Sequence, residues 1–312
     1  MTVRLLDESA EGVFIISATP FSENGTLDLQ SADRLVEFYI EKGVSGVTIL
    51  GMMGEAQKLT SDESAAFLKR VLKRVDNRVQ VIVGVSSAGL DNLASLAKQS
   101  MDAGAAGVMV APVSGLGTEE KLYGYFRQVF AALGTEIPVC YQDYPFVTGS
   151  EISVPAFNRL VADYPQLVML KHEEWPGLNK LSLVRKAVDN GVRRVSVLVG
   201  NGGLYLPQEL ARGADGAMTG FAYPEMLVEV VRLHKAGEQD RAEDLFDAYL
   251  PLVRHEQQPG FGLALRKETL FRRGVIACPK VRAPGATLNS TDHDELSRLI
   301  RRVEKNVRAL AS

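Results

Sequence analysis

The stretch LVMLKHEEWPG, from Leu167 to Gly177, decides how the rest of the chain is interpreted. Its first four residues are apolar, and so short a run before a Pro-Gly break predicts a buried strand rather than a helix. Lys171 stands at the end of this run. A lysine there either extends to water or sits partly buried, where burial favours the neutral amine. Since a neutral amine attacks carbonyl carbons to form a Schiff base, Lys171 is a candidate nucleophile.

The composition describes an ordinary globular chain. Its 312 residues suffice for one large α/β domain or a barrel with an appendix. The net charge is -3, so the chain has no excess of positive charge, which argues against nucleic acid as a partner. The first residues, MTVRLLDESAEG, lack the apolar core of a signal peptide, and no run has the length of a membrane span. We therefore expect a cytoplasmic protein with no membrane partner.

Short apolar runs alternate with amphipathic segments along most of the chain. The predicted strands are Val13–Ala18, Gly46–Leu50, Val79–Val83, Gly107–Ala111, Pro138–Tyr141, Val168–Lys171, Ser196–Val199 and Gly216–Thr219. Strands separated by helices form parallel sheets, which leaves an open doubly wound sheet and a closed barrel as alternatives. The open sheet usually carries a Gly-rich phosphate turn after its first strand, and TPFSENG at 19–25 is not one. The regular spacing favours an α/β fold of the (β/α)8 TIM barrel type.

The helical segments complete this pattern. Between the strands we predict helices at Leu29–Lys42, Ser61–Val75, Asn92–Ala103, Glu119–Leu133, Val154–Tyr164, Lys180–Asn190 and Leu204–Arg212. After Phe221 only helices follow, at Pro224–Lys235, Gln239–Leu252, Phe261–Arg273 and Asp292–Leu310. We predict that residues 1–223 form the barrel core that carries the active site. Residues 224–312 then supply the last barrel helix and a C-terminal helical extension.

In a (β/α)8 barrel the active site lies at the C-terminal ends of the strands, so the residues that end each run are candidates. The second run ends in GMMGE (51–55), where two glycines let backbone N–H groups form a nest for a carboxylate or phosphate. Such Gly-rich turns are also common for structural reasons alone. The candidate substrate-binding residues at the ends of the second, fourth and eighth strands are Gly51, Met52, Met53, Gly54, Ser114 and Met218.

The fifth strand ends in CYQDYPFVTG (140–149), which is rich in groups that transfer protons or bind hydroxyls. The alternative is a turn set by Pro145 and Gly149, with the tyrosines as packing residues. The candidates here are Tyr141, Gln142 and Tyr144 for catalysis and Asp143 for substrate binding.

The run His172-Glu173-Glu174 contains residue types that bind metals. Neighbours in an extended segment point to opposite faces, and no second histidine is placed to help. Cys140 and Cys278 are far apart and have no metal or redox spacing. We therefore predict no metal site.

These motifs match a known family in order and spacing. They are ATPF followed by NG (18–25), a GxxGE turn followed by LT (51–60), VGVSS (83–87), IPV with P and TG (137–149), the lysine after the sixth strand, and VRAP (281–284). The chain resembles the dihydrodipicolinate synthase/N-acetylneuraminate lyase family of Schiff-base (class I) aldolases and lyases. The resemblance implies a (β/α)8 barrel with a C-terminal helical extension. It also implies a homo-oligomer, a tetramer or a dimer.

The resemblance assigns roles to several of the candidates. Lys171 becomes the lysine that condenses with the ketone of pyruvate or another 2-oxo acid. The backbone at Met52 and Met53 becomes the site of the keto acid's carboxylate. The imine acts as an electron sink, so that an enamine attacks an aldehyde partner or is released from one. This chemistry uses no metal and no bound cofactor.

The chain departs from the family pattern at the turn after the second strand. Typical members read GTTGE with two threonines that serve the site, and here both positions are methionine. The methionines remove the hydroxyls but keep the backbone donors, so binding of a keto acid is compatible with them. Synthases also carry a tyrosine after the fourth-strand proline, where this chain has Ser114.

A second departure concerns the fifth strand. The family's proton-relay tyrosine aligns with Gln142, while Tyr141 lies one place earlier and Tyr144 shares the strand parity of Gln142. A one-residue bulge would bring Tyr141 into register. The arginine with which synthases bind the carboxylate of the second substrate aligns with Val147. Loss of this bidentate contact argues against the dicarboxylic product of the lysine pathway.

Four functions remain open. The leading hypothesis is a lyase or aldolase that uses Lys171 and acts on a 2-oxo acid and an aldehyde. The second is an authentic 4-hydroxy-tetrahydrodipicolinate synthase, which joins pyruvate and aspartate semialdehyde. The third is a barrel that has lost turnover and only binds a keto acid. The fourth is a pyridoxal-phosphate lysine on a barrel.

Overall fold

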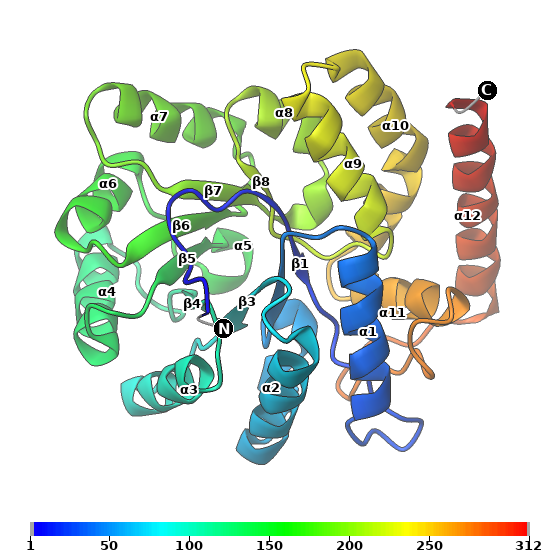
Figure 1. Ribbon diagram of the computed structural model, residues 1–312, viewed down its shortest axis with the longest axis horizontal. Helices are drawn as coiled ribbons and strands as arrows, with labels where there is room; N and C mark the ends of the chain where they lie inside the picture. The colour runs from blue at the N-terminus through cyan, green and yellow to red at the C-terminus, as the bar shows by residue number, and fades with distance from the viewer. Residues whose placement is uncertain (1–2, 311–312) are drawn as a thin grey trace.

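The structure, a computed structural model, describes residues 3–310 and has a closed parallel barrel at its centre (Figure 1). Each strand is hydrogen-bonded to the next in chain order, and the eighth strand closes on the first. The strands are β1 (Gly12–Ile16), β2 (Gly46–Ile49), β3 (Gln80–Gly84), β4 (Gly107–Val110), β5 (Val139–Asp143), β6 (Leu167–His172), β7 (Ser196–Val199) and β8 (Gly216–Ala217). The predicted (β/α)8 barrel is confirmed.

Helices surround the barrel (Figure 1). They are α1 (Leu29–Glu41), α2 (Ser61–Val75), α3 (Leu90–Asp102), α4 (Glu119–Leu133), α5 (Pro145–Thr148), α6 (Val154–Asp163), α7 (Leu178–Asp189), α8 (Leu206–Ala211) and α9 (Pro224–Lys235). The predicted bounds of α2, α4 and α9 are those observed. α5 was not predicted as a helix, because Pro145 and Gly149 were interpreted as marking a turn. They instead start and cap a single helical turn.

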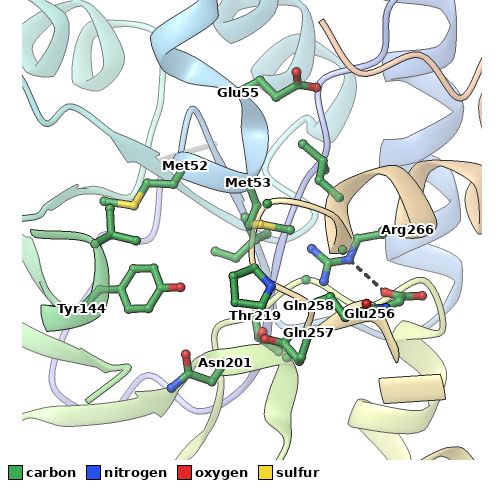
Figure 2. Close-up of a pocket in the computed structure, with 18 of the residues that line it drawn as sticks. Met52, Met53, Glu55, Tyr144, Asn201, Thr219, Glu256, Gln257, Gln258 and Arg266 are labelled. Atoms are coloured by element: carbon green, nitrogen blue, oxygen red, sulfur yellow. Dashed lines mark hydrogen bonds and ion pairs between the residues drawn. The ribbon is translucent and has the colours of Figure 1, made fainter. Parts of the chain in front are cut away.

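The C-terminal extension consists of α10 (Gln239–Glu256), α11 (Gly262–Arg272) and α12 (Ser290–Leu310). α10 runs one turn beyond the predicted end at Leu252, although Pro251 lies inside it. This extra turn brings Glu256 to a cavity at the mouth of the barrel (Figure 2). The predicted boundary between residues 223 and 224 falls at the start of α9 and stays a prediction. Among residues 3–310, no helix combines the length and the apolar character needed to cross a membrane.

Side chains of the strands alternate between two cores. One cluster fills the inside of the barrel and includes Phe14, Met109, Cys140, Met169 and Met218. A larger cluster lies between the strands and the helices, and it contains Tyr141 and Leu170, the neighbours of Cys140 and Met169. Because side chains in a strand alternate with a period of two, every second residue of β5 and β6 faces the barrel interior.

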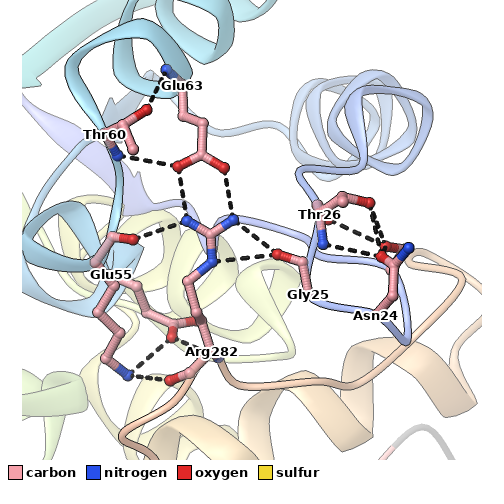
Figure 3. A network of polar contacts seen from close by, with 9 residues as sticks. Asn24, Gly25, Thr26, Glu55, Thr60, Glu63 and Arg282 are labelled. Atoms are coloured by element: carbon pink, nitrogen blue, oxygen red, sulfur yellow. Dashed lines mark hydrogen bonds and ion pairs between the residues drawn. The ribbon is translucent and has the colours of Figure 1, made fainter.

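Buried charges tie the extension to the barrel. Lys267 of α11 is completely buried, and its ammonium bonds the Glu55 carboxylate and the Lys280 carbonyl oxygen, the latter at 2.8 Å. The second oxygen of Glu55 accepts from Lys58 Nζ at 3.0 Å and from the Arg282 amide at 2.9 Å. Glu55 therefore joins the turn after β2 to the extension (Figure 3).

Arg282, from the VRAP motif, holds the segment after α11 in place (Figure 3). Its guanidinium donates to both carboxylate oxygens of Glu63, at 2.8 and 2.7 Å, and to the Gly25 carbonyl. These hydrogen bonds lower the pKa of Glu63 to about 2. Glu63 also completes a capping box with Thr60 at the start of α2. Val281 and Pro284, the neighbours of Arg282 in this segment, form part of the cavity wall, so the wall depends on the hydrogen bonds of Arg282.

We expect Lys267→Met to destabilise the protein by about 3 kcal/mol, because it leaves the buried Glu55 carboxylate with a weaker set of partners. Guanidinium unfolding measures this loss. Lys280→Met is the matched control, since among residues 3–310 the Lys280 ammonium bonds just the exposed carbonyl of Glu23. A Lys267→Met variant as stable as Lys280→Met would contradict a holding role for the buried pair.

Candidate active site

A cavity of about 450 Å³ opens at the carboxyl ends of the barrel strands (Figure 2). This is the end at which barrel enzymes carry their active sites. Its walls come from the strand ends, from the short turn η1 (Met52–Gly54) and from the extension. The polar residues that line it are Glu55, Gln57, Lys58, Gln142, Tyr144, Lys171, Glu173, Asn201, Thr219, Glu256, Gln257, Gln258 and Arg266.

Lys171 lies in this cavity with one carboxylate beside it. Its side chain is almost completely buried, and Nζ is 2.9 Å from Oε2 of Glu173. The same oxygen accepts a hydrogen bond of 2.7 Å from Nε2 of Gln142. Gln142 is paired with Lys171 in the register between β5 and β6, so both side chains enter the cavity at one level. The site thus holds an amine, a proton acceptor and a neutral donor in contact.

Glu173 is held in position by the end of β7. A Cβ atom at Gly200 would lie 2.2 Å from Cγ of Glu173, so only glycine leaves room for this side chain. The amide of Asn201 donates to the Glu173 carbonyl at 3.1 Å. From the sequence, Glu173 was interpreted only as a possible metal ligand, and no catalytic role was predicted for it. The available signal was its spacing, since a residue two places after Lys171 faces the same side of an extended segment.

The turn η1 presents two backbone donors to the cavity. Gly54 N and Glu55 N donate back to Gly51 O and Met52 O, each at 3.0 Å, which curls the chain after β2. The amides of Met52 and Met53 donate no hydrogen bond within residues 3–310, and both residues line the cavity. Gly51 and Gly54 lie buried behind them. The turn predicted to bind a carboxylate or phosphate therefore has two free N–H groups, and that binding stays a prediction.

Tyr144 is the candidate tyrosine that lines the cavity. It follows β5 directly and precedes α5. Burial, and then the charge of Glu173, raise the pKa of its phenol. The hydroxyl therefore stays protonated at neutral pH and is available as a hydrogen-bond donor.

Tyr141 lies outside the cavity, contrary to the prediction of a catalytic role. Its ring packs against Phe126 and Phe157, with centroids 4.6 and 5.9 Å away, in the layer between strands and helices. Its hydroxyl is buried without a hydrogen-bond partner among the described residues. The ladder between β5 and β6 does shift register between Val139 and Cys140, but the extra residue is Val168 of β6, and Tyr141 still points outward.

Asp143 also faces outward, so the prediction that it binds substrate is wrong in its placement. Its carboxylate accepts from Lys180 Nζ of α7 at 2.7 Å and lies 3.7 Å from Nδ1 of His172. Burial opposes the charge on His172, but Asp143 outweighs it and raises the histidine pKa. Lys180 also pairs with Glu174. This outward cluster braces the strand segment that carries Lys171 and Glu173.

Two further candidates do not line the cavity. Ser114 is exposed in the loop after β4, away from the lining residues. Met218 is completely buried in the cluster inside the barrel, which also contacts Met53. Its neighbour Thr219 reaches the cavity instead. Successive side chains in an extended segment point in opposite directions, so Met218 and Thr219, which follow β8, cannot both face the cavity.

The extension contributes lining residues that the sequence patterns did not predict. Gln257 and Gln258 follow α10, Arg266 lies in α11, and all of them line the cavity with Glu256 (Figure 2). No local pattern marks these residues, because they reach the barrel mouth only through the long-range packing of α10 and α11.

Comparison with known proteins shows the family of this chain. The dihydrodipicolinate synthetase family model matches residues 9–303. An L-2-keto-3-deoxyarabonate dehydratase of Azospirillum brasilense is 30% identical over 304 residues, which cover 94% of each chain. A 4-hydroxy-tetrahydrodipicolinate synthase of Persephonella marina is 28% identical over 247 residues, covering 78% of this chain and 82% of the relative.

A solved structure of the same family has the same fold. The crystal structure of a dihydrodipicolinate synthase from Rhodopseudomonas palustris superposes with a TM-score of 0.94 at 47% sequence identity, covering 96% of this chain and 99% of that one. The family model, the curated relatives and the superposition each extend over most of the chain. The chain therefore belongs to the dihydrodipicolinate synthetase family of Schiff-base lyases and synthases, as its motifs predicted.

Proposed function

We propose that this chain is a lysine-dependent lyase that removes water from a hydroxylated 2-oxo acid through a Schiff base on Lys171. The observation that carries the proposal is the buried contact of 2.9 Å between Lys171 Nζ and Glu173 Oε2. It places a proton acceptor beside the nucleophile, in a cavity where the family's relay position holds Gln142. The dehydratase of Azospirillum brasilense supports the choice of an elimination.

Imine formation comes first. Glu173 accepts a proton from the Lys171 ammonium, and the neutral amine attacks C2 of the oxo acid. The C2–O bond then breaks and water leaves. The amides of Met52 and Met53 bind the C1 carboxylate, since it is attached to the carbon that Lys171 attacks and must lie near it.

Elimination follows from the imine. The protonated imine withdraws electrons, so the carboxylate of Glu173 removes a proton from C3 and an enamine forms. The enamine electrons then expel the hydroxyl group at C4, which leaves as water after taking a proton from Glu173 or from the Tyr144 hydroxyl. Hydrolysis of the unsaturated imine releases the product and restores Lys171.

The residues that line the cavity favour a substrate whose carbon chain carries hydroxyl groups. Gln142, Asn201, Gln257 and Gln258 carry neutral amides, and Thr219 adds a hydroxyl. Such groups both donate and accept hydrogen bonds, which suits the hydroxyls of a sugar-derived acid. Val147, which replaces the arginine of typical synthases, also lines the cavity and offers no charge for a second substrate's carboxylate.

Authentic dihydrodipicolinate synthesis is the second candidate, favoured by the 47% identity to the Rhodopseudomonas palustris protein. Two parallel assays separate the candidates. One supplies 2-keto-3-deoxy sugar acids with one carboxylate and with two, and measures loss of water from each. The other supplies pyruvate with aspartate semialdehyde and measures condensation. We expect turnover in the first assay alone, and Lys171-dependent condensation in the second would overturn the elimination proposal.

We also propose, from the family resemblance, a homo-oligomer, either a dimer or a tetramer. Sedimentation velocity of the purified protein measures its mass in solution. A species of the mass of one chain at micromolar concentration would contradict this assembly.

Borohydride trapping tests the nucleophile. We expect incubation with pyruvate and sodium borohydride to give one covalent adduct, located on Lys171 by peptide mass spectrometry, because reduction converts the imine into a stable amine. Lys171→Met should give none. Lys180, a second buried lysine, serves as the internal control and should remain unlabelled. An adduct on another lysine, or none with any 2-oxo acid, would refute the proposal.

Glu173→Gln tests the proton-transfer role. We expect kcat to fall about 10²-fold or more, because the amide cannot accept a proton, while the imine is still trapped on Lys171. Glu174→Gln is the matched control, since Glu174 pairs with Lys180 and does not line the cavity. It should change kcat by no more than about threefold. Equal losses in the two variants would show that Glu173 acts only through structure.

A further inference from the structure

Arg266 is a buried cation with unused donors. The residue is 3% exposed, and its one hydrogen bond within residues 3–310 runs from Nε to Oε2 of Glu256, at 3.1 Å. Neither Nη1 nor Nη2 donates to any described residue. Arg266 lines the cavity, and its guanidinium is turned into it (Figure 2). Since Arg266 lines the cavity and these two nitrogens bond no described residue, they are available to a ligand that enters it.

The backbone at the end of β8 makes room for this guanidinium. A Cβ atom at Gly220 would lie 2.5 Å from Nη1 of Arg266. Any other residue there would push the guanidinium out of its place. Thr219, the neighbour of Gly220, lines the cavity at the same point. The position of Arg266 is therefore built from two sides, by Gly220 on the barrel and by Glu256 on the extension.

Lys171 pairs with Glu173, and Lys58 is bonded to Glu55. Arg266 is also paired, with Glu256, but among the described residues only through Nε, so it keeps donors that could bind an anion. Burial raises the pKa of Glu256 to about 7, an effect that Arg266 opposes, and Oε1 of Glu256 has no hydrogen-bond partner among the described residues. Glu256 thus takes up a proton at little cost near neutral pH. Protonation leaves the guanidinium charge free for a ligand.

We infer that Arg266 binds a second carboxylate, at the end of the substrate remote from the carbon that Lys171 attacks. The inference rests on the proposed function and narrows its substrate to hydroxylated 2-oxo acids with a carboxylate at each end. Two guanidinium nitrogens match the two oxygens of a carboxylate, a geometry that hydroxyls do not use fully. Lys171 of β6 and Arg266 of α11 share one cavity of about 450 Å³, which has room for a chain of about five carbons.

A matched pair of 2-oxo acids tests this inference through imine trapping. 2-Oxoglutarate and 2-oxopentanoate have the same carbon chain and differ in whether the far end is a carboxylate or a methyl group. Borohydride trapping at increasing concentrations gives the half-labelling concentration of Lys171 for each acid. We expect the wild-type protein to prefer 2-oxoglutarate by about tenfold or more, because hydrogen bonds to a charged group are among the strongest.

Variants at Arg266 then show where the preference originates. Arg266→Gln removes the charge, and it should reduce the ratio of the two half-labelling concentrations to about one. Arg266→Lys keeps the charge without the two-pronged donor, so an intermediate ratio is expected even if Arg266→Gln folds poorly. Arg272→Gln is the control, since Arg272 lies on the same helix and contacts Glu268 and Ser297 outside the cavity. It should keep the wild-type ratio.

The outcomes separate this inference from the proposed function. If neither acid labels Lys171 in the wild-type protein, the Schiff-base function itself fails. If both acids label it equally, or if the preference survives in both Arg266 variants, Arg266 does not bind a distal carboxylate. A parallel loss of labelling by both acids in Arg266→Lys would assign Arg266 to the C1 carboxylate and overturn the inference.

Discussion

The alternation of side chains along β5 and β6 is the constraint on which the site depends. In these strands Cys140 and Met169 face the barrel interior, and Gln142 and Lys171 follow them on the same face toward the mouth. Residues of the other parity, such as Tyr141, pack against the helices. A shift of one residue in β6 would turn Lys171 out of the cavity, and the same shift in β5 would turn Gln142 out. The parallel ladder between the strands, which pairs Gln142 with Lys171, prevents this.

Buried charges near the barrel mouth are compensated in pairs. Lys171 and Glu173 pair inside the cavity, while Asp143 and Lys180 pair behind the barrel wall. A third pair joins Glu55 of the β2 turn to the extension. Each of these side chains is less than a tenth exposed, so an unpaired member would destabilise the fold. The outer pairs hold the strand end and the extension in place around the Lys171–Glu173 pair, which lines the cavity.

The extension makes this barrel different from a barrel that ends at its eighth helix. α10 and α11 cover the mouth and add Glu256, Gln257 and Arg266 to the lining. Barrel strands supply Lys171, and the extension supplies lining groups that follow the barrel in the sequence. Under the proposed function, this division lets the chemistry at Lys171 stay constant while the recognised end of the substrate changes, as is common among enzymes that share a fold.

The sequence by itself determined the barrel and the family and singled out Lys171 as the candidate nucleophile, because these depend on local periodicity and on motifs within short segments. It also placed the Gly51–Gly54 turn at the mouth. Only the tertiary structure decided that Gln142 and Tyr144 line the cavity while Tyr141 and Asp143 do not, since parity depends on where each strand begins to pair. The roles of Glu173 and Arg266 emerged in the same way. Their neighbours, Gly200 and Gly220, come from other strands, and such long-range contacts leave no pattern in the local sequence.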